Sequence, residues 1–194
     1  MNTLLRIDSS LRLKDSYSRR MGDYFVKQWK LKHPDGAILK RDTARSMIPH
    51  LTQQTVDAFF NEDLYSEDLP LSDKMIEELS QSSEILIMCP MYNYGIPSSL
   101  KAYFDLIIRT KKTFTYDHGI TGLLQNKKAH IISVMGGVHS VPGGKNPLET
   151  HLTHILNHLG IKDINYFPLE GTASPEQLSD KTKATEVLIF KHLH

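Results

Sequence analysis

The chain has 194 residues, and its 23 Lys and Arg nearly balance its 22 Asp and Glu, so the net charge at pH 7 is +1 with histidine neutral. This length fits one domain, residues 1–194, whose core needs no disulfide or structural metal. The charge balance argues against nucleic-acid binding and a polybasic membrane anchor. The longest apolar run, residues 85–91, is too short to cross a bilayer. The single Cys89 has no partner in its own chain and no signal-peptide run is visible, which together predict a cytoplasmic protein.

Short apolar runs alternate with longer amphipathic segments along the whole chain. The runs predict five strands, at residues 3–8, 37–41, 84–89, 129–134 and 163–167. The third run is apolar on both faces, as a central parallel strand requires when helices cover both sides of its sheet. The alternation is typical of an α/β fold in which a parallel sheet lies between two helical layers.

Segments with helical periodicity lie between the predicted strands and after the last one. Apolar spacings of three and four predict helices at residues 21–29, 98–108, 150–159 and from 174 onward. The last helix begins at Ser174, with Pro175 at its first position and Gln177 placed to complete a capping box. The acidic segment Met47–Ser72, which contains two prolines, is expected to be loop mixed with short helix.

The loops after the first, third and fourth strands are the candidate sites, because ligands of open parallel sheets bind beyond the carboxyl ends of the strands. The first loop, residues 9–18, is dense in hydroxyls and leads into a helix. Unpaired N–H groups and a partial positive charge at a helix start attract an anion, so this loop suits a phosphate. A serine N-cap in an ordinary polar loop is the alternative. Dinucleotide and P-loop motifs are missing here, because the first glycine, Gly22, already lies inside the helix, and this favours a mononucleotide.

The other two loops contain groups that suit a flat heteroaromatic ring. Residues 90–97 supply two aromatics, an amide and a glycine, although Tyr92 and Tyr94 are equally explained as anchors packed on the core. Residues 135–145 carry two glycine pairs, which let backbone N–H groups approach a ring closely. A purely structural turn is the alternative for this loop. Its Gly-Lys pair precedes Asn146 rather than Ser or Thr, so a nucleoside-triphosphate site is excluded.

Metal and hydrolase chemistry have weaker support. His151, His154 and His158 share a helical face, but they lie at the edge of its apolar stripe and are better explained as solvated or interface residues. No metal site is therefore expected. No G-x-S-x-G motif surrounds a serine, so the nucleophile found in many α/β hydrolases is missing.

With these loops placed, the sequence resembles the FMN-dependent NADH-azoreductases, which are relatives of the flavodoxin-like quinone reductases. The resemblance covers nearly the whole chain and rests on Ser9-Ser10 with Ser16-Tyr17-Ser18, Pro90 to Tyr103, Thr113 to Tyr116, and Gly136-Gly137-Val138-His139. It implies an α/β, flavodoxin-like three-layer sandwich with a central five-stranded parallel sheet. It also implies one non-covalent FMN per chain, with NADH or NADPH as co-substrate.

The same resemblance implies the site residues. Those expected to bind FMN are Ser10, Ser16, Tyr17, Ser18, Met91, Tyr92, Asn93, Tyr94, Gly95, Gly136 and Gly137. Among them, Asn93 is expected to orient the redox edge of the flavin, with Gly95 shaping its loop. Residues expected on the substrate side are Phe114, Tyr116 and His139. No acid, base or nucleophile is assigned, because the flavin carries the chemistry.

The sequence departs from the family at Val134 and Met135, where azoreductases often carry a polar or basic residue before the glycine pair. A cation or hydroxyl at that position can tune flavin electronics.

The implied function is transfer of two electrons from NADH or NADPH through FMN to quinones and azo compounds by a ping-pong mechanism. A flavodoxin-type electron carrier is the alternative, and a phosphodiesterase has less support. A homodimer is expected, in which the segment Thr113–Tyr116 projects Phe114 and Tyr116 toward the partner's flavin. The alternative for this segment is a short edge hairpin that covers its own core.

Overall fold

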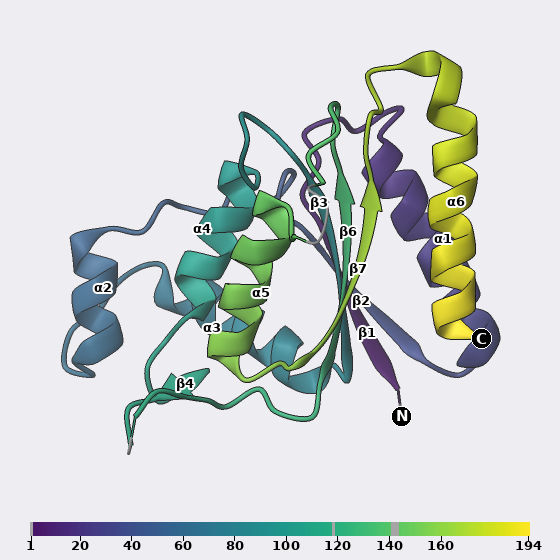
Figure 1. The fold of residues 1–194 in the computed structure, drawn as a ribbon. Helices are drawn as coiled ribbons and strands as arrows, with labels where there is room; N and C mark the ends of the chain where they lie inside the picture. The colour runs from purple at the N-terminus through teal and green to yellow at the C-terminus, as the bar shows by residue number, and fades with distance from the viewer. Residues whose placement is uncertain (1, 118, 141–143) are drawn as a thin grey trace.

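The computed structural model describes residues 2–117, 119–140 and 144–194, and within them a five-stranded parallel sheet lies between two helical layers (Figure 1). The strands are β1 (Thr3–Asp8), β2 (Ala37–Asp42), β3 (Glu84–Pro90), β6 (Lys128–Val134) and β7 (Asp163–Leu169). They pair in the order β2-β1-β3-β6-β7, all parallel. This order confirms the predicted flavodoxin-like sheet and puts its switch point between β1 and β3.

Helices cover both faces of this sheet (Figure 1). One face carries α1 (Tyr17–Lys32) and α6 (Pro175–Leu193). The other carries α3 (Leu69–Gln81), α4 (Ser98–Ile107) and α5 (Pro147–Leu159), with the short α2 (Gln53–Phe60) outside them. A two-stranded antiparallel hairpin, β4 (Phe114–Thr115) with β5 (Thr121–Gly122), follows α4.

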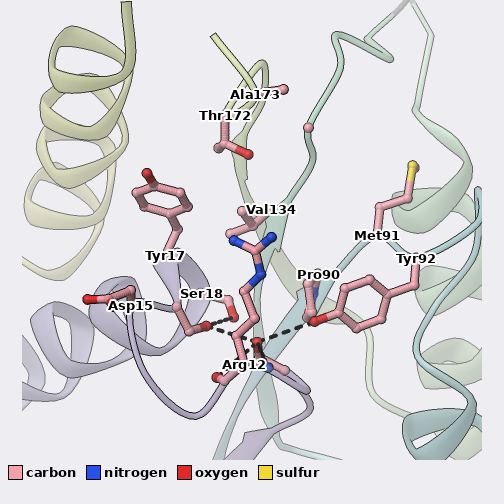
Figure 2. Close-up of a pocket in the computed structure, with 13 residues that line it drawn as sticks. Arg12, Asp15, Tyr17, Ser18, Pro90, Met91, Tyr92, Val134, Thr172 and Ala173 are labelled. Carbon is pink, nitrogen blue, oxygen red and sulfur yellow. Dashed lines mark hydrogen bonds between the residues drawn. The ribbon is translucent and has the colours of Figure 1, made fainter. Parts of the chain in front are cut away.

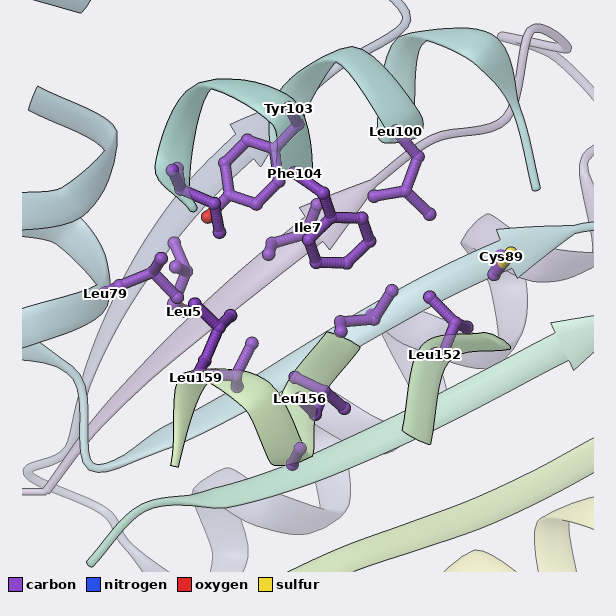
Figure 3. Close-up of a cluster of buried hydrophobic side chains, with 14 of the residues drawn as sticks. Leu5, Ile7, Leu79, Cys89, Leu100, Tyr103, Phe104, Leu152, Leu156 and Leu159 are labelled. Atoms are coloured by element: carbon purple, nitrogen blue, oxygen red, sulfur yellow. The ribbon is translucent and has the colours of Figure 1, made fainter. Parts of the chain in front are cut away.

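Alternate residues of each strand supply the two halves of the core. Leu4 packs on the side of α1 and α6, whereas its neighbour Leu5 packs on the side of α3, α4 and α5. Figure 3 shows the second cluster, in which Leu79, Phe104 and Leu156 come from three different helices. A strand covered in this way must be apolar on both faces, which is the pattern that identified β3 in the sequence.

The start of α5 differs from the prediction. The helix begins at Pro147 instead of residue 150, because Asn146 caps it by accepting a hydrogen bond at 3.0 Å from the N–H of Glu149. The start of α6 at Pro175 is confirmed, but the predicted capping box is wrong, since Ser174 makes no side-chain capping bond.

The segment expected to be loop with short helix contains α2, as predicted, and the first turn of α3. Pro70 lies in that first turn, where a proline is compatible with the helix because its missing N–H would be unpaired there anyway. The helix α3 itself was not predicted, because Pro70 was interpreted only as a break in the chain and residues 73–81 were given no element.

A buried polar cluster lies at the amino end of the sheet, away from the loops of interest. Glu84, at the start of β3, accepts a hydrogen bond from the indole Nε1 of Trp29 at 3.0 Å and pairs with Nε2 of His130 at 2.8 Å. Burial opposes ionisation of Glu84, but these bonds outweigh it and lower its pKa from 4.5 to about 2. The carboxylate therefore stays ionised and ties β3 to α1 and β6.

The lowered pKa makes Glu84 a source of pH-dependent stability, present above pH 4.5 and lost as the pH falls through about 2. We expect Glu84→Gln to reduce the free energy of unfolding at pH 7 by about 2 kcal/mol, because it removes the carboxylate charge that pairs with the buried Trp29 and His130. The pH dependence between these two values should flatten. Urea unfolding followed by circular dichroism measures both effects, with the exposed Glu67→Gln as control. Identical pH profiles for the two variants would contradict this expectation.

Candidate functional site

A cavity of about 430 Å³ opens at the carboxyl edge of the sheet, beside the switch point (Figure 2). Its walls come from the loops after β1, β3, β6 and β7. The lining residues are Ser10, Arg12, Asp15, Ser16, Tyr17, Ser18, Pro90, Met91, Tyr92, Val134, Gly136, Thr172 and Ala173.

Three buried serine hydroxyls, of Ser10, Ser16 and Ser18, form a serine cluster at one end of this cavity. The Ser16 hydroxyl donates to Oγ of Ser10 at 2.9 Å and lies 3.1 Å from Oγ of Ser18. The Tyr92 hydroxyl extends the chain, 3.4 Å from Oγ of Ser10, from the opposite wall (Figure 2). The cluster therefore joins the loop after β1 to the loop after β3.

The start of α1 completes the polar end of the cavity. The Ser16 side chain caps the helix by accepting the N–H of Arg19. Among the hydrogen bonds between described residues, none uses the backbone N–H of Tyr17 or Ser18. Free N–H groups at a helix start beside three hydroxyls are the donor set that binds a phosphate dianion.

Arg19 fixes the loop of residues 9–16, here called the phosphate loop. Its guanidinium makes a two-point pair with Asp42 at 2.6 and 3.1 Å, and it donates to the carbonyls of Ser10 at 2.8 Å and Arg12 at 3.2 Å. Burial opposes ionisation of Asp42, but the bonds from Arg19 outweigh it and lower the pKa of this carboxyl. The pair therefore stays charged, and Arg19 is satisfied by the protein itself.

The loop after β3 is a tight two-residue turn. Tyr92 and Gly95 exchange backbone hydrogen bonds of 3.0 Å, and between them Asn93 and Tyr94 have φ values of 48° and 65°. Two successive left-handed residues are characteristic of a type I′ turn. The expectation that Gly95 shapes this loop is wrong, because Gly95 has no positive φ and a Cβ there would lie 3.9 Å from its nearest neighbour.

Tyr94 is the strained member of this turn. Asparagine tolerates the left-handed region, whereas a tyrosine there is uncommon. The side chain of Tyr94 is 81% exposed, and its ring meets His139 edge-on with centroids 6.1 Å apart. Strain held by an exposed aromatic, in a loop whose residues Met91 and Tyr92 line the cavity, points to a functional position for that ring.

The loops after β6 and β7 form the remaining wall together. The N–H groups of Thr172 and Ala173 donate to the carbonyls of Met135 and Gly136, each at 3.1 Å. A Cβ added at Gly136 would meet only the Cβ of Ala173, at 3.8 Å, so glycine leaves this wall open to a ligand. Sequence reasoning missed Thr172 and Ala173 because it considered only three loops, although the strand before them is the neighbour of β6.

The structure brings most of the predicted cofactor residues together. Those that line the cavity are Ser10, Ser16, Tyr17, Ser18, Met91, Tyr92 and Gly136. Those that lie in the same loops but not in its lining are Asn93, Tyr94, Gly95 and Gly137. Arg12 and Asp15 also line it and were not predicted, because only the hydroxyls of their loop were weighed.

Phe114 is placed differently from the prediction. It is 4% exposed and packs on His158, with ring centroids 4.5 Å apart, so the expected projection from the surface is wrong for this residue. The hairpin folds back on the end of α5, where Leu124 donates to the carbonyl of Leu159. Tyr116 remains 58% exposed. The hairpin that contains Phe114 lies at the amino end of the sheet, opposite the cavity (Figure 1).

Across the described ranges, no group of three or more His, Cys, Asp or Glu side chains is arranged to hold a metal ion. No helix in the part of the chain that the structure describes is long and apolar enough to cross a membrane.

Fold and cavity together define a doubly wound α/β protein with an anion site of hydroxyls and helix N–H groups at its switch point. The chain matches the family described as Flavodoxin-like fold over residues 2–189. It is 39% identical over 175 residues to an FMN-dependent NADH:quinone oxidoreductase of Xanthobacter autotrophicus, covering 84% of each chain. It is 37% identical over 190 residues to one of Hydrogenovibrio crunogenus, covering 94% of each. The chain therefore belongs to the flavodoxin-like family and, within it, to the FMN-dependent NADH:quinone oxidoreductases.

Solved structures agree with this fold. An azoreductase from Bacillus anthracis str. Sterne has a TM-score of 0.89 at 20% identity, covering 100% of this chain and 99% of that one. An FMN-dependent NADH-azoreductase from Bacillus anthracis str. Ames Ancestor, in complex with FMN, has a TM-score of 0.84 at 22% identity, covering 100% of both chains. At these identities the likeness establishes the fold.

The strained turn gives a test of Tyr94 that needs no substrate. We expect Tyr94→Gly to raise the free energy of unfolding by about 1 kcal/mol, because glycine adopts a positive φ without steric cost. Tyr94→Phe keeps both the ring and the strain, and it should leave stability unchanged. Urea unfolding at pH 7 measures the difference. A less stable Tyr94→Gly variant would mean that packing of the ring outweighs the backbone strain.

Proposed function

We propose that this protein transfers two electrons from NADH to quinones and azo compounds through bound FMN, by a ping-pong mechanism. The observation that carries the proposal is the serine cluster beside the free N–H groups of α1, inside a cavity at the switch point of the sheet. Such a site holds a terminal phosphate without a dinucleotide motif.

The lining residues fit FMN. The serine cluster and the N–H groups of Tyr17 and Ser18 would hold the phosphate, while Met91, Tyr92 and the open backbone at Gly136 would face the ring. The volume of about 430 Å³ lies within the usual range for cofactor pockets. Bound FMN supplies the acceptance and donation of electron pairs, and the chain's own residues bind it, orient it and leave one face open.

The relatives named as quinone oxidoreductases favour this enzyme over a simple electron carrier or a phosphodiesterase. Their names also favour NADH over NADPH as the electron donor. As part of the proposal, we assign the enzyme to the cytoplasm and treat it as one folded domain. Its one cysteine, Cys89, is buried and unpaired, as is usual in a reducing compartment.

The central experiment is an FMN titration of the purified protein. We expect a yellow protein with one FMN per chain, and roughly 10- to 100-fold weaker binding in Ser10→Ala and Ser18→Ala, since each removes a hydrogen bond to a charged group. Ser46→Ala, at a half-buried serine outside the cavity lining, serves as control. A wild-type protein that neither purifies with FMN nor binds it would end the proposal.

Steady-state kinetics test the order of the reaction. NADH and a soluble quinone must each stack on the same open face of the flavin in turn, so double-reciprocal plots should give parallel lines. An azo dye as second acceptor should give the same pattern. Intersecting lines would show that donor and acceptor bind together.

We extend the proposal to a homodimer whose sites are completed across the interface. Tyr116 does not line the cavity of its own chain, and its ring rests edge-on against the buried Phe114, with centroids 5.2 Å apart. Large apolar side chains are also exposed around α2 and the hairpin, namely Leu51, Phe60, Leu64, Tyr65 and Ile120. Exposed apolar side chains of this kind usually mark interfaces. In a two-fold dimer, each cavity would receive Tyr116 of the partner subunit.

A dimer should sediment as such at micromolar concentration. Tyr116→Ala should raise the KM for quinone by about fivefold, the equivalent of roughly 1 kcal/mol for one aromatic contact. Phe190→Ala, an exposed aromatic on α6 in the opposite helical layer, is the matched control. A monomer with full activity, unaffected by Tyr116→Ala, would remove the shared-site proposal and leave the flavin assignment standing.

A further inference from the structure

Few charged side chains lie in or beside the cavity, and some of them are already paired within the protein. Its only charged lining residues among the described part of the chain are Arg12 and Asp15. The neighbouring Arg19 is already neutralised by Asp42, and Arg20 stacks over the ring of Tyr17 at 4.6 Å. A phosphate dianion in the serine cluster would therefore meet one carboxylate and one cation.

Arg12 is anchored beside the serine cluster by its backbone. Its N–H donates to Oγ of Ser10 at 3.3 Å, and its carbonyl accepts from Nε of Arg19 at 3.2 Å. The guanidinium itself takes part in no hydrogen bond or ion pair between described residues. Figure 2 shows it extended into the cavity between Tyr17 and Tyr92.

We infer that Arg12 binds the flavin phosphate and makes the site selective for a phosphorylated flavin over riboflavin. The inference rests on the proposed function. A guanidinium can bind two phosphate oxygens at once, and it remains charged at any working pH. The serines supply neutral donors, so Arg12 supplies the positive charge that a dianion requires next to Asp15. Its exposed side chain is free to turn toward the phosphate from its anchored backbone.

Asp15 provides a second, opposite test. Its φ is 53°, a left-handed conformation that asparagine also tolerates, so Asp15→Asn removes the like charge without straining the loop. This variant should bind FMN more tightly, whereas Arg12→Gln should bind it more weakly. Riboflavin, which lacks the phosphate, should respond to neither change.

The experiment is equilibrium dialysis of the full-length protein against FMN and, separately, against riboflavin. Arg12→Gln should weaken FMN binding roughly 10-fold, the scale of one charge-assisted hydrogen bond, with riboflavin binding unchanged. Lys14→Gln is the matched control, because it removes the same charge from the same loop at a position outside the cavity lining. Raising the salt concentration should reduce the preference of wild type for FMN and leave that of Arg12→Gln nearly constant.

Equal losses for FMN and riboflavin in Arg12→Gln would overturn the inference, because Arg12 would then act on the loop or the ring and not on the phosphate. Unchanged FMN affinity in that variant, with normal binding by wild type, would also overturn it and leave the proposed function intact. Failure of wild type to bind either flavin would instead count against the proposed function.

Discussion

The two-point pair between Arg19 and Asp42 is the interaction on which the site depends. Arg19 belongs to α1 and Asp42 ends β2, so the pair joins the first helix to the edge strand. The same guanidinium holds two carbonyls of the phosphate loop, which fixes the loop between them. A loop ordered by the fold has little conformational entropy left to lose when a ligand binds. The serine hydroxyls are therefore positioned by a charge that Asp42 already neutralises.

The two ends of the sheet use polar groups in different ways. At the amino end, Glu84 is matched by Trp29 and His130 within the protein, and the cluster contributes to stability. At the carboxyl end, the N–H groups of Tyr17 and Ser18 and the guanidinium of Arg12 have no hydrogen-bond or ion-pair partner among the described residues. The positive φ of Tyr94 lies at that same end. Natural proteins accept such unmatched or strained groups where they bind something.

Burial periodicity explains which parts of the fold were predictable. β3 was recognised because both of its faces are apolar, and α4 because its stripe repeats over a full ten residues. Helix starts were harder, since they depend on a single side chain such as that of Asn146 and not on a repeated pattern. Phe114 shows a further limit, because whether an aromatic faces water is decided by what folds over it, here the end of α5.

The site was predictable where one loop alone supplied the chemistry. The hydroxyls of the serine cluster all fall within residues 10–18 and could be recognised without coordinates. Thr172 and Ala173 enter the cavity through pairing with Met135 and Gly136, a relation between loops that are far apart in the chain. The role of Arg19 likewise depends on Asp42, which lies 23 positions away.

The serine cluster has a consequence for how a cofactor is exchanged. Its hydroxyls bond to one another, so each can rotate its proton from a neighbouring oxygen to an anion while every heavy atom stays in place. Each hydroxyl of the cluster has a hydrogen-bond partner as it stands, so rotation of the hydroxyl protons would be enough to receive an anion. In such a site the hydroxyl hydrogens rotate while the oxygen atoms keep their positions. Release of the anion would then need only the reverse rotation, with the hydroxyls bonding to one another again.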